Sequence, residues 1–568
     1  MNHNVINFAD VMDLFSNTIC APATRSGGAI AVIRLSGDGA IAIADKVFTP
    51  KSGRGLAGAA GYSLHYGEIR DSSAESGQNS SGSSSAPGGR GQGELIDEVV
   101  VSVFRAPHSY TGEDSVEISC HGSEYIISRI LELLVSNGAK MALPGEFTQR
   151  AFVAGKMDLS QAEAVADVIA SRTAAAHRIA MSQLKGGFSG ELAKMRAELL
   201  HIVSLMELEL DFSEEDVEFA DRSELRSLLD KTTGHISRLI SSFKLGNAIK
   251  NGVPVAIAGA ANAGKSTLLN AILGEERAIV SDIPGTTRDT VEETFNLDGV
   301  LFRFIDTAGL RETSDAIETL GVGRSYEKIA AASLVLAVAD LTAPLAEIKA
   351  SAADIAGRIT SGQQLIFVLN KADVVPEETV RQAREAVRAA AVASLQTHKA
   401  VQAAAVADGR GRQEESQLGG GAVRDAEAGV AAGDRTAAIA AGRGRQDADA
   451  RCFAISAKSR QGLAELLQSV SDTYRTIAHG TEGTLVTNLR HLDALKSALT
   501  PLLRVRDGLG TGSRSGSSSS AISVSRPVPT DLLAQDIREA LYHLGSIVGE
   551  ITTDEILGNI FKNFCIGK

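Results

Sequence analysis

Three short motifs in the middle of the chain constrain its fold more than any other feature. The string GAANAGKST spans Gly259 to Thr267 and matches the pattern G-x-x-x-x-G-K-[ST]. In a loop of this pattern, backbone N–H groups surround phosphate oxygens, Lys265 reaches the β- and γ-phosphates, and the Ser266 hydroxyl ligates Mg²⁺. The apolar run before the loop predicts a buried strand, and residues 266–273 predict the helix that leaves it. The sequence therefore predicts a P-loop nucleotide-binding fold.

The other two motifs narrow the nucleotide to GTP. DTAG follows an apolar run, and its Asp306 is placed to hold the Mg²⁺ shell. NKAD follows another such run, and its Asp373 accepts hydrogen bonds from the ring N–H and the exocyclic amine of guanine, a pair that adenine does not present. SAK, at 456–458, follows a third run as a further base-side element. Any one of these strings also suits an ordinary strand-end turn, but four in order, each after a strand, predict GTP binding.

The segment between the P-loop and DTAG has the composition of a switch loop. It contains GTTRD, in which Thr287 is the expected second Mg²⁺ hydroxyl, ordered by the γ-phosphate. Leu310 follows DTAG where Ras-type proteins place the Gln that orients water, so the missing group comes from a bound monovalent cation or a partner. Three acidic residues downstream are candidates to position water, although for any single one a place on a solvated helix face is the better interpretation: Glu312, Asp315 and Glu318.

Composition sets limits on the class of protein. A chain of 568 residues is too long for one core, so two to four domains are expected. A net charge of −13 argues against a general electrostatic binder of nucleic acid, although a local basic patch for tRNA stays open. The four cysteines include no C-x-x-C pair, so neither a zinc site nor a disulfide framework is expected. No signal sequence or 18-residue apolar span is found, which predicts a soluble cytoplasmic protein without a membrane segment.

The pattern along the chain predicts a multidomain protein of α/β and all-α parts. An α/β domain is expected at 1–142, and helical periodicity follows over 143–248. A Ras-like P-loop G domain is expected at 249–478, inserted before a second helical part at 479–568. Within the G domain, an Ala/Gly/Arg-rich insertion near 386–450 is read as an extruded loop.

Several local elements are also predicted. The first α/β domain should contain one strand ending near Arg34, others at 98–104 and 115–120, and a helix near 124–136. The string SQAE, from Ser160, reads as a capping box that opens a helix. Two further low-complexity tracts, 71–93 and 507–526, are expected to be loops.

The chain also resembles the MnmE (TrmE) family of tRNA-modification GTPases, within the TrmE-Era-EngA-YihA-Septin-like superfamily. The resemblance rests on the tail FCIGK, with AVIRLSG, PHSYTGEDSVEISCHG, PGEFTQRAFVAGKMDLSQAEA, NAGKSTLLN, PGTTRD and DTAGLRET. It covers most of the chain outside the three low-complexity tracts. Two departures are a Gly-rich turn at 23–28 that is shorter and lacks prolines, and Ala260-Ala261 in place of Arg-Pro in the P-loop.

The resemblance implies a reaction and its components. Members work with the flavoprotein MnmG, which carries FAD, to add an aminomethyl or carboxymethylaminomethyl group to carbon 5 of the wobble uridine of certain tRNAs. The one-carbon donor is a 5-formyl- or methylene-tetrahydrofolate bound by the N-terminal domain, which also forms a homodimer, and a heterotetramer with the partner is a further expectation. The matching motif positions for folate are Arg34, Glu117, Lys156 and Lys568.

The resemblance also assigns the missing hydrolytic groups. It implies a potassium ion held by Asn262 with Ser281, Ile283 and Thr286, and a water-positioning role for Glu318. Cys565 is a candidate nucleophile toward uridine, with a buried small apolar residue as the equal alternative. The amine donor, glycine or ammonium, stays open.

Motifs and resemblance together give one set of expected GTP contacts. These are Asn262, Ala263, Gly264, Lys265, Ser266, Thr267, Ser281, Asp282, Ile283, Pro284, Gly285, Thr286, Thr287, Asp306, Thr307, Ala308, Gly309, Asn370, Lys371, Ala372, Asp373, Ser456, Ala457 and Lys458. The alternative functions are a GTP-switched RNA-binding or ribosome-assembly factor that does no modification chemistry, and a paralogue that only binds GTP. An assembly factor has no reason to carry the FCIGK tail and the folate-type motifs, whereas the paralogue is distinguished by GTP turnover in potassium and in sodium buffer.

Overall fold

The chain forms two compact units in a computed structural model. Unit 1 comprises Met1–Ala170, Ala180–Asp230 and Ala494–Lys568, and unit 2 comprises Ser171–Ile179 and Lys231–Asp493. The structure describes residues 17–24, 27–71, 93–211, 222–274, 293–305, 329–360, 363–394, 451–479, 484–509, 529–550, 557, 560–561, 564 and 567. The fold is a mixed one, with two sheets and many helices, as the sequence predicts.

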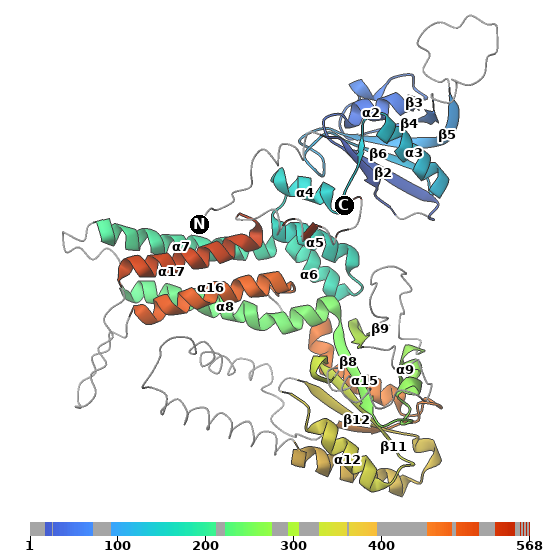
Figure 1. The fold of residues 1–568 in the computed structure, drawn as a ribbon, viewed down its shortest axis with the longest axis vertical. Helices are drawn as coiled ribbons and strands as arrows, with labels where there is room; N and C mark the ends of the chain where they lie inside the picture. The colour runs from blue at the N-terminus through green and yellow to red at the C-terminus, as the bar shows by residue number, and fades with distance from the viewer. Residues whose placement is uncertain are drawn as a thin grey trace, which may run out of the picture. The chain divides into compact units, whose positions relative to one another are not determined.

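The first sheet of unit 1 has seven strands in the order β3-β4-β5-β6-β2-β1-β7 (Figure 1). The strands are β1 (Ile19–Pro22), β2 (Ile30–Ser36), β3 (Phe48–Pro50), β4 (Ser63–Asp71), β5 (Glu94–Phe104), β6 (Ser115–His121) and β7 (Lys140–Met141). Neighbours are antiparallel except for the parallel pair β1 and β7. Alternate residues of β5, Val99, Val101 and Val103, are buried in a core shared with α2 (Ala40–Val47) and α3 (Glu124–Ser136). A short 3₁₀ helix, η1 (Leu56–Gly58), lies beside α2.

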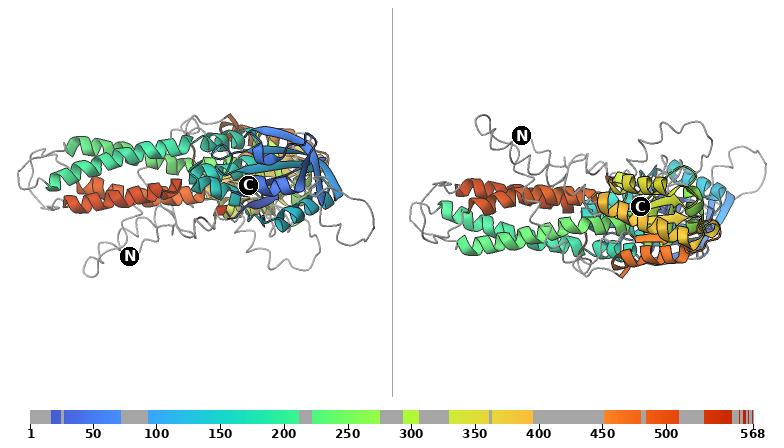
Figure 2. Two further views of the ribbon diagram at one scale, coloured as in Figure 1. Left: turned by 90° about the horizontal axis from the view of Figure 1, so that it is seen from above. Right: turned by 90° about the horizontal axis from the view of Figure 1, so that it is seen from below.

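Helices make up most of the rest of the described part of unit 1. They include α4 (Glu146–Val153), α5 (Leu159–Ala170), α7 (Gly187–Asp211) and α17 (Thr530–Val548). Helices α7 and α17 lie side by side in Figures 1 and 2. The ion pairs of Arg196 with Glu550 and of Arg538 with Glu207 show that the two helices are antiparallel. Three more helices pass from one unit into the other: α6 (Ala174–Leu184), α8 (Arg222–Asn251) and α16 (Leu489–Gly508).

The capping box that opens α5 lies two residues earlier than predicted. Asp158 Oδ1 accepts the Gln161 N–H at 2.9 Å, and Gln161 Oε1 accepts the Asp158 N–H at 2.9 Å. Ser160 is 1% exposed and lies inside the helix. The SQAE prediction was therefore wrong in register, because Asp caps as well as Ser and Gln replaces Glu as the reciprocal acceptor.

The sheet of unit 2 has the order β13-β12-β11-β8-β10-β9. Its strands are β8 (Val253–Gly259), β9 (Glu293–Leu297), β10 (Val300–Phe304), β11 (Leu334–Asp340), β12 (Gln364–Asn370) and β13 (Arg451–Ala454). All neighbouring pairs are parallel except β9 with β10. Parallel strands need helical crossovers on the sheet faces, which explains why their residues are buried on both sides.

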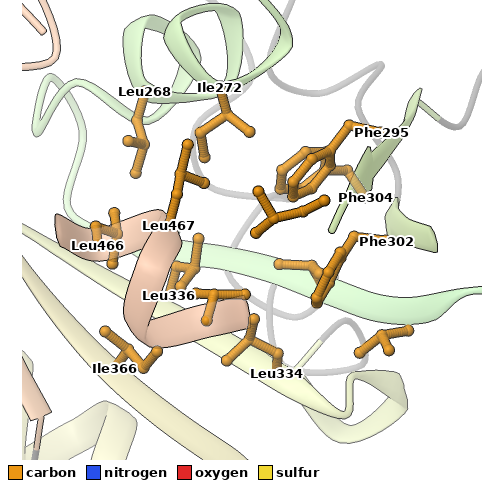
Figure 3. Close-up of a cluster of buried hydrophobic side chains, with 14 of the residues drawn as sticks. Leu268, Ile272, Phe295, Phe302, Phe304, Leu334, Leu336, Ile366, Leu466 and Leu467 are labelled. Atoms are coloured by element: carbon orange, nitrogen blue, oxygen red, sulfur yellow. The ribbon is translucent and has the colours of Figure 1, made fainter. Parts of the chain in front are cut away.

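Two apolar clusters cover the two faces of this sheet. One is formed with α9 (Lys265–Leu273) and α15 (Leu463–His479), and it includes Leu268, Ile272 and Phe302 (Figure 3). The first half of α6 joins this cluster through Ala175. The other is formed with α12 (Leu345–Ala356) and the helix of residues 377–394. The loops that follow β8, β12 and β13 lie at the sheet edge where these parallel strands end.

The expected insertion begins later than the sequence suggested. Residues 386–394 are helical, and Val387, Ala390 and Ala391 are buried in the second cluster. Reading this stretch as loop was wrong because its alanines supply a small apolar face at helical spacing. The remainder, 395–450, lies outside the described residues. No helix in the described part of the chain is long and apolar enough to cross a membrane.

Candidate functional site

The P-loop follows β8 and turns sharply into α9. Gly259 has φ +149° and Gly264 has φ +91°, backbone conformations that suit glycine. A Cβ on Gly259 would collide with the Val338 carbonyl on β11, and one on Gly264 would collide with the Asn370 side chain. Asn262 also has a left-handed backbone, with φ +59°, and is exposed. The loop is therefore held tightly against the sheet while its outer residues face solvent.

The P-loop residues that are predicted to bind phosphate and Mg²⁺, Lys265 and Ser266, lie at the start of α9. Lys265 Nζ donates to the carbonyls of Gly259, at 3.0 Å, and Ala260, at 2.7 Å. Ser266 lies in the first turn of the helix and is half-buried. The positive end of the helix dipole favours an anion at this end. A hydroxyl beside that anion is an oxygen donor of the kind that Mg²⁺ prefers.

Asn370 joins three of the predicted motifs. Its Nδ2 donates to the Ala263 carbonyl of the P-loop at 2.9 Å, and its Oδ1 accepts the Ala457 N–H of SAK at 3.0 Å. The side chain is buried, with Asn370 only 3% exposed. A buried amide with both its donor and its acceptor engaged fixes the spacing between the loops that it joins.

The rest of NKAD and SAK forms the base side of the site. Asp373 is exposed in the 3₁₀ helix η4 (Ala372–Val374), which follows Lys371. Ser456 is 1% exposed, and its Oγ accepts the Ser459 N–H at 3.2 Å. Lys458 is exposed. The structure thus leaves the Asp373 carboxylate, which the sequence predicts to read guanine, exposed while the loops behind it are fixed.

Lys371 makes an ion pair with Asp340 at the end of β11. Its Nζ lies 2.5 Å from Asp340 Oδ2, and the two side chains are 38% and 19% exposed. Burial alone would raise the pKa of Asp340, but hydrogen bonds from Lys371 and Thr342 outweigh it and lower that pKa. Asp340 is therefore ionised at neutral pH.

Much of the predicted phosphate side lies outside the described residues. This applies to the switch residues Ser281, Asp282, Ile283, Pro284, Gly285, Thr286 and Thr287, to Asp306, Thr307, Ala308 and Gly309, and to Glu318. Strand β10 lies parallel beside β8 and leads into DTAG, as the motif requires.

In unit 1, the structure brings Arg34 and Glu117 together. They face each other on β2 and β6, and Arg34 Nη2 lies 2.8 Å from Glu117 Oε1. The Arg34 guanidinium also lies over the rings of Tyr110, at 5.3 Å, and Phe147, at 5.7 Å. Burial raises the pKa of Tyr110. A charged pair flanked by two rings can take a flat, polar heterocycle that has a carboxylate tail.

Gly567, near the C-terminus, contacts the same Arg34 side chain. Arg34 Nη1 donates to the Gly567 carbonyl at 3.3 Å. Gly567 has φ +89°, and a Cβ there would collide with the Pro22 carbonyl. Its neighbours Cys565 and Lys568 lie outside the described residues. Lys156 Nζ donates to the Pro107 carbonyl, in the loop that also carries Tyr110, at 2.8 Å.

A buried polar network supports that loop from behind. Arg150 of α4 pairs with Glu113 at 3.0 Å and with Glu146 at 2.9 Å, and its side chain is 1% exposed. Glu113 also accepts the Ser36 hydroxyl at 2.7 Å. The Tyr110 hydroxyl lies 2.9 Å from that of Thr148 on α4. Strand, loop and helix are therefore tied together behind the two rings.

Sequence reasoning missed several of these residues. Tyr110, Phe147 and Arg150 lie in strings that carried the family resemblance, but no spacing or charge pattern set them apart. Asp340 had a usable signal, because a carboxylate at the end of a parallel strand beside NKAD is placed to meet its Lys.

Together these features define a P-loop domain of the GTPase type, attached to an antiparallel sheet domain and to long helices. A model described as the MnmE helical domain matches residues 159–565, and one described as the N-terminus of the GTP-binding protein TrmE matches residues 18–156. The chain is 46% identical over 555 residues to the tRNA modification GTPase MnmE of Parabacteroides distasonis, covering 97% of this chain and 100% of that one. It is 45% identical over 553 residues to that of Bacteroides thetaiotaomicron, covering 97% and 99%.

The chain belongs to the MnmE family, which confirms the resemblance stated from its motifs. Among solved structures, a GTP-binding protein from Sulfolobus solfataricus in complex with GDP is 13% identical, covers 50% of this chain and 67% of that one, and has a TM-score of 0.22. That likeness is too low to carry any inference.

Proposed function

We propose that the chain is a GTP-hydrolysing enzyme that takes part in tRNA modification. The observation that carries the nucleotide part is the bridge of Asn370, which ties the P-loop to SAK in a chain of the MnmE family. Ser266 and Thr287 are the proposed Mg²⁺ hydroxyls, and Lys265 is the proposed β/γ-phosphate ligand. Asp306 and Glu318, outside the described residues, are proposed to hold the metal shell and the attacking water.

A tetrahydrofolate bound at Arg34 and Glu117 is the proposed source of the one-carbon unit. When bound, this cofactor supplies a carbon at the formyl or methylene level. Arg34 suits its glutamyl carboxylates, and Glu117 suits paired N–H donors of the pterin ring. In the described pair these two charges satisfy each other, so the ligand must exchange into an existing ion pair. Lys156 and Lys568 are the further proposed contacts.

Cys565 is the proposed nucleophile toward the uridine. Burial raises the pKa of the Cys20, Cys120 and Cys452 thiols, in each case to about 11, so these three stay protonated at neutral pH. Cys565 lies two residues before Gly567, whose carbonyl meets Arg34. The tail position supports a role beside the proposed folate.

A second copy of the chain and an MnmG-type flavoprotein carrying FAD are the proposed protein partners. One face of the first sheet exposes a band of large apolar side chains, with Leu64 at 72%, Tyr66 at 52% and Val100 at 38%. Tyr66 and Val100 are cross-strand neighbours on β4 and β5. Apolar bands of this kind are typical of interfaces, which supports a homodimer through this domain.

Nucleoside analysis of tRNA tests the modification role. In cells that lack the protein, the aminomethyl-type groups on wobble uridines are expected to be lost, and the wild-type chain should restore them. A chain with Lys265→Ala should not restore them, because GTP turnover is proposed to drive the reaction. Unchanged uridines in the deletion strain would instead favour a ribosome-assembly factor.

Potassium dependence tests the proposed cation. GTP turnover should be at least about tenfold faster in potassium than in sodium buffer, because the cation supplies the charge that an arginine finger otherwise brings. Asn262→Ala should remove most of that difference, since Asn262 lies on the exposed side of the P-loop. Asn270→Ala, an exposed residue of α9, is the matched control and should keep the potassium effect. Equal, slow rates of the wild type in both buffers would reject potassium activation and favour a chain that only binds GTP.

A further inference from the structure

We propose that Asp340 is a positioning residue of the guanine site, which acts by holding the side chain of Lys371. The proposal rests on the nucleotide site argued above and adds to it a residue outside the four motifs. In this arrangement the methylene stem of Lys371 forms a fixed apolar wall against one face of the base. Asp340 itself touches no nucleotide atom.

The ends of two neighbouring strands place the pair. Asp340 is the last residue of β11, and it lies in register with Asn370, the last residue of β12. The residue after Asn370 is Lys371, whose backbone is left-handed with φ +65°. That conformation turns its side chain back toward the end of β11, where the ammonium meets Asp340.

Both oxygens of the Asp340 carboxylate are used. Oδ1 accepts the Thr342 N–H at 2.9 Å and the Thr342 hydroxyl at 2.7 Å, which fixes the plane of the group. Oδ2 is then directed to Lys371 Nζ at 2.5 Å. A carboxylate fixed in this way is a rigid acceptor rather than a freely rotating surface charge.

A lysine side chain that is already ordered contributes more to the free energy of ligand binding than one that must be ordered on binding. A lysine side chain has four rotatable methylene bonds and loses rotamer entropy when it is ordered. Asp340 orders Lys371 before the nucleotide arrives, so the ligand does not bear that cost. Lys371 is two residues before Asp373, and in the proposed arrangement its stem lies beside the base that Asp373 would read.

Replacing the carboxylate should weaken binding without changing base selection. Asp340→Asn is expected to lower the affinity for GDP and for IDP by the same factor, about tenfold, as the ordering cost returns to the binding step. IDP lacks the exocyclic amine of guanine, so the GDP/IDP ratio reports Asp373 and not the stem. The KM for GTP should rise while kcat holds. Thr342→Val, which keeps the backbone N–H, should weaken GDP binding less.

A double-mutant cycle separates positioning from general damage. Lys371→Ala should weaken GDP binding, and Asp340→Asn should then add nothing in that background. Glu378→Gln is the control, because Glu378 makes a similar but exposed ion pair with Arg381. It should bind GDP as the wild type does.

The outcomes are distinguishable. Additive losses in the cycle, or a changed GDP/IDP ratio in Asp340→Asn, would overturn the positioning role. A wild-type chain that binds neither GDP nor GTP would instead reject the nucleotide site itself. If Asp340→Asn does not fold, the Thr342→Val and Lys371→Ala pair decides the question by the same test of additivity.

Discussion

Asp373→Asn is expected to reverse the nucleotide preference of the protein. An amide keeps one acceptor for the ring N–H but presents a donor in place of the other acceptor, so the exocyclic amine of guanine would face another N–H. The affinity for GTP should fall on the order of 10³-fold or more, because a site built for specific hydrogen bonds rejects a mismatched base strongly. Xanthosine triphosphate, whose ring carries an oxygen in place of the amine, should gain affinity.

Competition binding with GTP and xanthosine triphosphate measures this reversal. Asp354→Asn is the matched control, since Asp354 is an exposed carboxylate on α12 that pairs with Arg358. It should leave both affinities unchanged. A uniform loss of both nucleotides in Asp373→Asn would mean that Asp373 supports the loop without reading the base.

Arg150→Ala is expected to destabilise the first sheet domain severely. Arg150 is 1% exposed at its side chain and pairs with two carboxylates that are themselves nearly buried. Removing it leaves Glu113 and Glu146 buried without their cation, and breaking such a buried pair costs about 3–5 kcal/mol. The Tyr110 loop should lose its support at the same time.

Hydrogen exchange of the β2 and β6 amides measures this loss within the domain concerned. It is preferable to a single melting temperature because a chain with two units need not unfold in one step. Arg381→Ala removes an exposed arginine of the other unit and should leave the same amides unchanged. Protection that survives in Arg150→Ala would show that the carboxylates are satisfied without the arginine.

The parts of the fold that were predictable are those that depend on neighbours in sequence. The P-loop needed only its own spacing, because glycines at 259 and 264 adopt backbone conformations that suit glycine. The strand before NKAD was also predictable from its own residues, because they form an apolar run. The cap of α5 shows the limit, since Asp158 and Ser160 are both good caps and only the hydrogen bond to Gln161 decides between them.

The residues that reasoning missed depend on contacts far apart in the chain. The proximity of Asp340 to Lys371 becomes apparent only once β11 is known to lie beside β12. No spacing in the sequence sets Arg150 apart, and its burial becomes visible only when α4 packs beside the loop that holds Glu113. Conversely, the alanines at 390 and 391 looked like low complexity until a sheet was there to pack against.

The hydrogen bond from Arg34 to Gly567 can form only late in the synthesis of the chain. Its two residues are 533 positions apart, so the arginine leaves the ribosome long before its acceptor exists. At about 5–20 residues per second, this delay is roughly half a minute to two minutes. A nascent chain truncated before Gly567 should therefore have the sheet around Arg34 without the contact made by the tail. Only chains synthesised past Gly567 would then have this contact to Arg34.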